Sequence, residues 1–189
     1  MTETADVIII GAGQAGLSLS HELAHAGVDH LVLERGRVGE TWRGRWESFC
    51  LVIPNWTVQL PGWPYRGGDP DGFMPRDAIV AHLVAYARSF RAPVREGVRV
   101  MALEQGEAGR FLLRTSSGDI RARQIVLASG AYQKPHRPPA AAQLPASLYV
   151  IDAEEYTAPG ALPPGALIRS RPRRACGTAR RLTRCGHDW

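Results

Sequence analysis

The clearest pattern in the chain is an apolar strand, a helix and a second apolar strand within the first 35 residues. Residues 6–10 form an apolar run rich in β-branched side chains, which is typical of a strand buried on both faces. Residues 17–26 have helical spacing, and Gly27 marks the end of this helix. Residues 31–33 form the second strand, so the order predicts parallel strands joined by a right-handed crossover. The side chains available for a packing face of the helix are Leu17, Leu19, Leu23 and Ala24.

A long irregular segment follows over residues 36–75. It is rich in glycine and proline, holds four of the five tryptophans of the chain and shows little periodicity. Irregular stretches of this length inside compact chains are usually functional. Residues 76–91 then return to helical character, with Ile79, Leu83, Tyr86 and Ala87 at helix spacing.

The remaining pattern predicts a small β-meander. Strands are expected at 94–103, 110–115 and 120–127, with a turn at Ser117-Gly118-Asp119 between the last two. A connector rich in proline and alanine covers residues 134–147, and a short strand is expected at 148–151. The fold class is therefore α/β, with a parallel sheet and a small β-meander.

A glycine motif joins the first strand to the first helix. A G-x-G-x-x-G match is weak alone, but here a strand precedes it, a helix follows it and an acid ends the next strand. The first glycine permits the tight turn, the second lets a pyrophosphate approach the backbone, and the third allows close helix–strand packing. The acid would accept hydrogen bonds from the adenosine ribose. The residues that we expect to bind the dinucleotide are Gly11, Gly13, Gln14, Ala15, Gly16 and Glu34.

The motif leaves three interpretations open. FAD and NAD both carry ADP, so the motif by itself does not separate them, and a glycine turn without any ligand is the third interpretation. Other segments favour FAD.

The segment after Glu34 resembles the flavoprotein monooxygenases that include the flavin-containing, N-hydroxylating and Baeyer–Villiger enzymes. The likeness starts with residues 34–43, a glycine-rich stretch that ends in Trp-Arg, and continues with 45–49, 54–56, 60–62 and the helix at 76–91. It reaches residues 126–132, which are similar to a strand end that contacts FAD in that family, and covers about residues 5–165. The resemblance implies a Rossmann-like FAD-binding domain. It adds Arg35, Thr41, Trp42, Arg43 and Gly130 to the expected cofactor contacts, although singly Trp42 fits a core aromatic and Arg43 a surface charge equally well.

The function that this resemblance implies is FAD- and NADPH-dependent oxygenation of a small organic substrate. The flavin would carry the chemistry while the protein positions and shields it. No side chain stands out as a general acid or base, so the catalytic residues stay unassigned, and His21, His25 and His30 are interpreted as surface residues. The alternatives are a non-catalytic dinucleotide-binding fragment or another FAD- or NAD-dependent oxidoreductase; the absence of Cys-x-x-Cys disfavours a redox dithiol.

Two departures from the family pattern stand out. Residues 51–54 read Leu-Val-Ile-Pro where the family has Leu-Asn-Thr-Pro, and Val52 has no hydrogen-bond donor in its side chain. After Ile168 the family continues into a second glycine motif that opens an NADPH domain, and that motif is missing here. We therefore expect an incomplete FAD-binding domain over residues 1–168 and impaired activity.

Residues 169–189 form an arginine-rich tail that we expect to be disordered or the product of a frameshift. Seven arginines and one acid give the tail a charge of +6, so the first 168 residues carry −1 of the total of +5. Translation of the coding DNA in the other two frames would test the frameshift. A basic tail that binds nucleic acid is the competing interpretation, but the main body lacks a basic footprint.

Composition limits the remaining classes of function. An apolar content of 44% and a charged content of 22% are ordinary for a soluble globular protein, and no apolar run reaches the length of a membrane span. The N-terminus lacks the features of a signal peptide, so a cytoplasmic protein is expected. The three cysteines, Cys50, Cys176 and Cys185, fit no common zinc pattern, and no metal site is predicted.

Overall fold

The computed structural model describes residues 3–106, 109–130 and 136–165. The arginine-rich tail, Cys176 and Cys185 lie outside the described residues, so the predictions for them stay predictions. The same holds for the division of the chain at residue 168. The elements in chain order are β1 (Glu3–Ile10), α1 (Gln14–His25), β2 (His30–Leu33), α2 (Glu40–Arg43), the 3-10 helix η1 (Asn55–Thr57), β3 (Gln59–Leu60), β4 (Trp63–Pro64), α3 (Arg76–Ser89), β5 (Val94–Arg95), β6 (Val100–Gln105), β7 (Phe111–Thr115), β8 (Gly118–Leu127), and the 3-10 helices η3 (Pro139–Gln143) and η4 (Pro159–Ala161).

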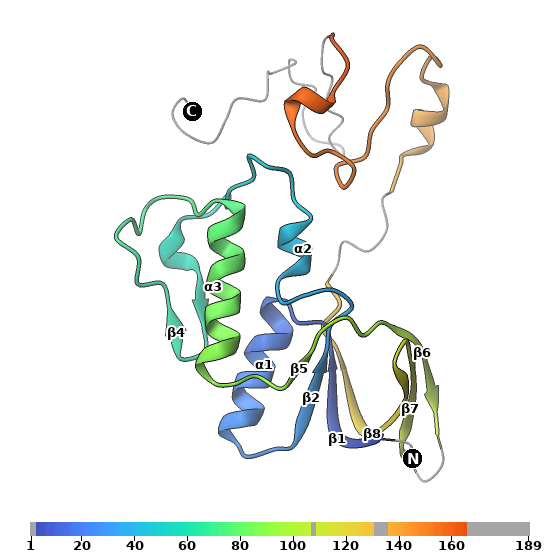
Figure 1. Cartoon of the computed structure of the whole chain (residues 1–189). Coiled ribbons are helices and arrows are strands. Elements are labelled where there is room, and N and C mark those ends of the chain that lie inside the picture. The colour runs from blue at the N-terminus through green and yellow to red at the C-terminus, as the bar shows by residue number, and fades with distance from the viewer. Residues whose placement is uncertain (1–2, 107–108, 131–135, 166–189) are drawn as a thin grey trace.

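A six-stranded sheet organises these elements in the order β5-β2-β1-β8-β7-β6 (Figure 1). β1 pairs in parallel with β2 on one side and with β8 on the other, and β2 pairs in parallel with β5. β6, β7 and β8 form the antiparallel meander. The predicted strand–helix–strand unit and the predicted meander are thus confirmed, and β8 joins them into one sheet. β3 and β4 form a separate two-stranded ribbon.

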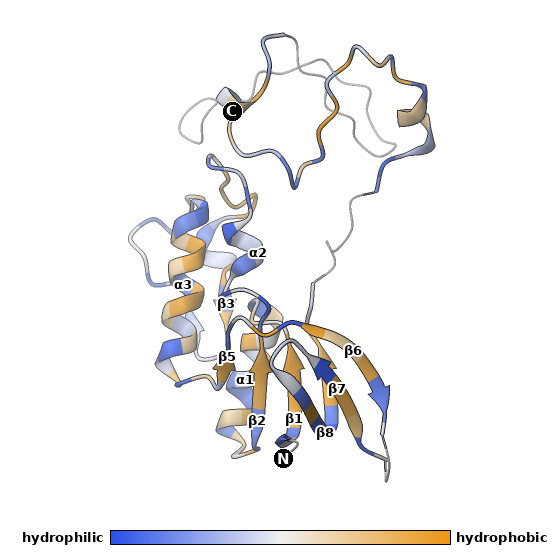
Figure 2. Ribbon diagram, turned by 45° about the vertical axis from the view of Figure 1, so that its right-hand side comes forward, coloured by the Kyte–Doolittle hydropathy of each residue, from blue (hydrophilic) through white to orange (hydrophobic). Residues whose placement is uncertain are grey.

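The central strands are buried on both faces because helices cover one face and the meander curls over the other. α1 and α3 lie on the same side of the sheet (Figure 1). On that side Ile9 and Val32 pack with Leu17 and Tyr86, all of them buried. On the opposite side Ile8 packs with residues of the meander. Figure 2 shows β1 and β2 as hydrophobic towards their carboxyl ends, where Val7–Ile9 and Val32–Leu33 are buried, which is the pattern that double-sided burial requires.

The strand predicted for residues 94–103 is wrong, because the structure divides it into β5 and β6. These two strands lie at opposite edges of the sheet, so the chain must cross between them. Gly97 adopts φ +74° in this crossing, a conformation that side chains disfavour. A continuous apolar pattern does not reveal such a change of neighbour.

Three smaller predictions are also wrong. Residues 148–151 form no strand because no described strand lies beside them to pair with, and Tyr149 is exposed. The tight turn falls at Ser116–Ser117, and Gly118 is already the first residue of β8. Ala24 is exposed, since the buried face of α1 consists of Gly16, Leu17 and Ser20.

His30 is not a surface residue but a buried one. Its Nδ1 lies 2.9 Å from the carbonyl oxygen of Val28, and its Nε2 lies 2.8 Å from Ser20 Oγ. The ring therefore links the start of β2 to α1. His21 is largely covered by Tyr86, on which its ring stacks, whereas His25 is exposed as predicted.

Helices α1 and α3 end in the same way but with different residues. Gly27 follows α1 with φ +68° and donates its N–H to Ala24, while the next N–H reaches back to Leu23. Arg91 follows α3 with φ +54° and donates to Arg88 in the equivalent bond. Both ends are Schellman motifs, in which glycine is favoured at the left-handed position. No described helix is long and apolar enough to cross a bilayer.

We expect Arg91→Gly to raise the free energy of unfolding by about 0.5–1 kcal/mol, because glycine removes the cost of a left-handed conformation. Urea denaturation of the two proteins measures this difference. Gly27→Ala is the matched control and should lower the free energy by a similar amount. An unchanged or lower midpoint for Arg91→Gly would contradict the argument.

The buried hydroxyl of Tyr86 also lowers the free energy of unfolding by a measurable amount. The residue is fully buried and its hydroxyl has no hydrogen-bond partner among the described residues. Burial raises the pKa of Tyr86 to about 12, and the charge of Glu22 adds to this. An unpaired buried hydroxyl is destabilising.

Tyr86→Phe should therefore raise the free energy of unfolding by about 1 kcal/mol at neutral pH. Since the pKa of Tyr86 is higher in the folded state, the wild type should lose stability as pH rises from about 10 towards 12, and the variant should lose less. Urea midpoints measured from pH 7 to alkaline pH check both effects. Parallel loss of stability in the two proteins would show that Tyr86 is not the cause.

Candidate dinucleotide site

The glycine turn lies where the carboxyl ends of three parallel strands meet. β1 ends at Ile10, and Gly11 donates its N–H to the carbonyl of Leu33 at the end of β2, over 2.8 Å. On the other side Ala128, just after β8, donates to Ile10 over 2.9 Å. From β1 the chain runs outward on one side through β2 to β5, and it returns on the other side through β6 and β7 to β8, so the strand order reverses beside β1. In open α/β sheets, ligands bind at such a point.

Two of the glycines are required by close backbone contacts. Gly11 adopts φ +111°, and a Cβ on it would lie 2.5 Å from the carbonyl oxygen of Ala128. A Cβ on Gly16 would lie 1.9 Å from the carbonyl oxygen of Gly11. Gly16 is thus the residue that lets α1 pack against the turn, as its place in the motif predicts.

Gly13 differs from both, because a Cβ there would meet nothing within 4 Å. It is the N-cap of α1 and makes no side-chain capping bond. The N–H groups of the first helical turn have no acceptor within the helix, and the positive end of the helix dipole lies beside them. An open space bordered by free N–H groups can accept a phosphate.

Glu34 ties the end of β2 to the glycine turn. Its carboxylate is buried and accepts the N–H of Ala12 over 2.8 Å and the N–H of Gly36 over 2.9 Å. The sequence predicted an acid that binds ribose. The structure places it beside the turn and adds a role in holding two loops together, which the motif did not reveal.

A set of backbone bonds keeps residues 34–39 next to the turn. Gly36 and Glu34 accept the N–H groups of Gly97 and Val98, and Ala12 accepts the N–H of Gly39. Val98 and Gly97 were missed by sequence reasoning because they lie in the segment taken for a continuous strand. The glycine within that run was the one available signal.

Helix α2 directly follows residues 34–39 and carries Thr41, Trp42 and Arg43. Trp42 is half-buried and lies 5.7 Å from the ring of Phe49, between two hydrophobic clusters. Arg43 is also half-buried, with its Nε 4.0 Å from a carboxylate oxygen of Glu40. Their expected contact with a flavin stays a prediction, and their packing agrees with a structural role as well.

The other predicted residues surround the turn in different ways. Gln14 and Ala15 are exposed on the first turn of α1, and Arg35 is exposed after Glu34. Gly130 adopts φ +81° just beyond β8, two residues after Ala128, which lies against Gly11. Residues 131 and 132, the rest of that predicted strand-end motif, lie outside the described residues.

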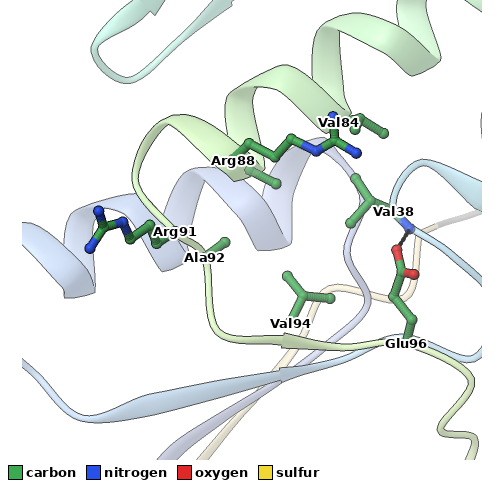
Figure 3. Close-up of a pocket in the computed structure, with 8 residues that line it drawn as sticks. Val38, Val84, Arg88, Arg91, Ala92, Val94 and Glu96 are labelled. Atoms are coloured by element: carbon green, nitrogen blue, oxygen red, sulfur yellow. Dashed lines mark hydrogen bonds between the residues drawn. The ribbon is translucent and has the colours of Figure 1, made fainter.

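A cavity of about 510 Å³ lies apart from these residues, between the end of α3 and the edge strand β5. Figure 3 shows Val38 on its wall, with the N–H of Val38 bonded to the carboxylate of Glu96 over 2.8 Å. None of the predicted dinucleotide contacts lines it. Within the described part of the chain, no three His, Cys, Asp or Glu side chains are grouped to hold a metal ion.

We expect Gly16→Ala to lower the free energy of unfolding by about 2 kcal/mol or more, because the added methyl overlaps the carbonyl of Gly11. Gly13→Ala should cost under about 1 kcal/mol, the difference between glycine and alanine at an N-cap. Thermal or urea unfolding of both variants tests the contrast. Equal losses would mean that the helix is not packed as closely as described.

Comparison with known proteins gives one family and several partial relatives. The profile of the family described as pyridine nucleotide-disulphide oxidoreductase matches residues 8–158. An uncharacterized oxidoreductase CzcO-like of Geobacillus kaustophilus is 33% identical over 89% of this chain and 48% of its own length. The indole-3-pyruvate monooxygenase YUCCA1 of Oryza sativa is 33% identical over 69% of this chain and 33% of its length.

A solved structure agrees with these relatives. The flavin-containing monooxygenase from Stenotrophomonas maltophilia superposes with a TM-score of 0.65 and 26% identity, over 72% of this chain and 42% of that protein. The chain spans about half the length of the curated relatives that it matches over most of its own length. These matches confirm the Rossmann-like fold and the resemblance to flavoprotein monooxygenases that the sequence predicted.

Proposed function

Because this chain belongs to the pyridine nucleotide-disulphide oxidoreductase family, we propose that it is the FAD-binding part of a flavoprotein monooxygenase. The observation that carries the proposal is the open space at Gly13, at the N-terminus of α1, with the buried carboxylate of Glu34 bonded to the N–H of the neighbouring Ala12. This arrangement fits the ADP half of FAD. Flavin monooxygenases among its partial relatives favour FAD over NAD as the bound dinucleotide.

Each residue of the site has a role that its geometry supports. Gly13 leaves room for the pyrophosphate, and the N–H groups of Gln14 and Ala15 would donate to it. Glu34 holds the turn in shape with one lone pair on each oxygen and would accept ribose hydroxyls with the others. Arg35 lies exposed where it would flank the adenosine.

The flavin half of the cofactor would extend towards Gly130 and α2. Gly130 directly follows Ala128 and Ser129, which lie against Gly11, and α2 is joined to the turn through the bond from Gly39 to Ala12. When bound, FAD supplies the redox chemistry of oxygenation, and the side chains of Trp42 and Arg43 would orient it and restrict access of water. Use of NADPH and oxygenation of a small organic substrate are proposals for the whole protein.

The first test is binding of FAD by the purified chain, followed by the shift in its visible absorption and by quenching of its fluorescence. Gly13→Ala should weaken binding about tenfold or more, because its methyl occupies the pyrophosphate space while the fold tolerates it. Gly68→Ala, in the loop between β4 and α3, is the matched control because its Cβ also meets nothing within 4 Å. It should leave affinity unchanged.

The result that would overturn the proposal is a folded wild-type chain that binds no FAD. Equal affinity in wild type and Gly13→Ala would place any flavin elsewhere. Tighter binding of NAD than of FAD would favour the alternative of a nicotinamide-dependent oxidoreductase.

A further inference from the structure

The second half of α1 carries two histidines that the proposed function does not use. His21 and His25 are four residues apart, a spacing that places two side chains on the same face of a helix, one above the other. Their ring centroids lie 4.4 Å apart, and the ring planes are tilted by 46°. Two imidazoles this close on one rigid helix can act together as ligands of a metal ion. We call them the histidine pair.

The surroundings of His21 hold its ring in one orientation. The ring stacks on Tyr86 of α3 with the centroids 5.6 Å apart, and it meets the ring of Phe90 at 5.2 Å. Its Nδ1 lies 3.1 Å from a carboxylate oxygen of Glu22. Since an ionised carboxylate only accepts, Nδ1 carries the hydrogen, and Nε2 keeps its lone pair while the ring is neutral. Histidines that bind metals commonly donate their second ring N–H to a carboxylate in this way.

The space and the charge around the pair also suit a cation. Nε2 of His21 lies beside Gly62, in the turn between β3 and β4, where a Cβ would come within 3.0 Å of this nitrogen. A glycine therefore leaves space next to the nitrogen. His25 is exposed and makes no hydrogen bond within the part of the chain that the structure describes. The carboxylate of Glu22 and the negative end of the α1 dipole both favour positive charge here.

The sequence of this turn, His-Glu-Leu-Ala-His over residues 21–25, matches the H-E-x-x-H pattern of zinc peptidases. In those enzymes the zinc has three protein ligands, and the glutamate acts as a general base. Here the carboxylate of Glu22 is bonded to His21, and the described residues contain no group of three metal-binding side chains. The geometry therefore supports a binding site with two protein ligands and does not support peptidase chemistry.

We propose that the histidine pair binds one divalent transition-metal ion through Nε2 of His21 and a ring nitrogen of His25, with water in the remaining positions. Imidazole suits Zn²⁺, Ni²⁺ and Cu²⁺, whereas Mg²⁺ and Ca²⁺ prefer oxygen ligands. The pair lies on the second half of α1, while the proposed dinucleotide site lies at the first turn of this helix. The inference thus goes beyond the proposed function and does not depend on it.

Calorimetric titration of the untagged 189-residue chain with Ni²⁺ tests the proposal. Every protein compared, including the parent, carries Cys176→Ser, Cys185→Ser and His187→Ala, so that thiolates and the last histidine of the chain do not compete for the ion. We expect one Ni²⁺ per chain, tighter binding of Cu²⁺ and no binding of Mg²⁺. Absence of saturable Ni²⁺ binding up to about 1 mM would overturn the proposal.

Three variants of this parent locate the ion. His25→Ala should weaken Ni²⁺ binding about tenfold or more, because one of two protein ligands is lost. His21→Phe keeps an aromatic ring against Tyr86 but removes both nitrogens, and it should weaken binding to a similar extent. His136→Ala, which removes an exposed histidine outside the pair, is the matched control and should bind Ni²⁺ like the parent.

The urea midpoint of His25→Ala without metal should match that of the parent, since His25 is exposed. A loss of Ni²⁺ affinity in this variant then reports a lost ligand and not a damaged fold. Equal Ni²⁺ affinity in the parent and in His25→Ala would place the ion elsewhere and overturn the proposal. The same conclusion would follow if His136→Ala weakened binding as much as His25→Ala.

Discussion

The site depends on the contact between Gly16 and the carbonyl of Gly11, where a single methyl group would not fit. This contact lets α1 begin directly after β1 and aim its N–H groups at the space beside Gly13. The same contact presses Leu17 into the core against α3. Packing of the helix and geometry of the site are therefore one constraint, because both require the same approach of backbone to backbone.

Strand β8 imposes a second close backbone contact on the other side of the glycine turn. It is a strand of the parallel sheet beside β1 and also the last strand of the meander. Its end sets Ala128 against Gly11, which is the reason Gly11 also lacks room for a side chain. The strand serves both partners because β1 pairs with one of its edges, from Ile120 to Leu127, and β7 pairs with the other, from Gly118 to Ala122.

In the loops, hydrogen bonds to buried polar side chains hold the backbone in place. Glu34 fastens the glycine turn, and Asn55 holds the long segment before α3 through bonds to the backbone of Asp69 and Met74. His30 with Ser20 does the same between β2 and α1. Each is a polar group whose burial is compensated by hydrogen bonds to fixed backbone or side-chain atoms. The irregular segments are thus held in place with only the short ribbon of β3 and β4 as regular pairing.

The sequence by itself determined the local elements and the chemistry of the first βαβ unit. Periodicity, a glycine motif and a terminal acid are encoded within about 30 neighbouring residues, so the strands, the helix and the place of Glu34 could be predicted. Only the tertiary structure decided which strands are neighbours. It divided residues 94–103 between two edges of the sheet, denied residues 148–151 a partner and buried His30. Pairing and burial depend on residues far apart in the chain, and no local pattern records them.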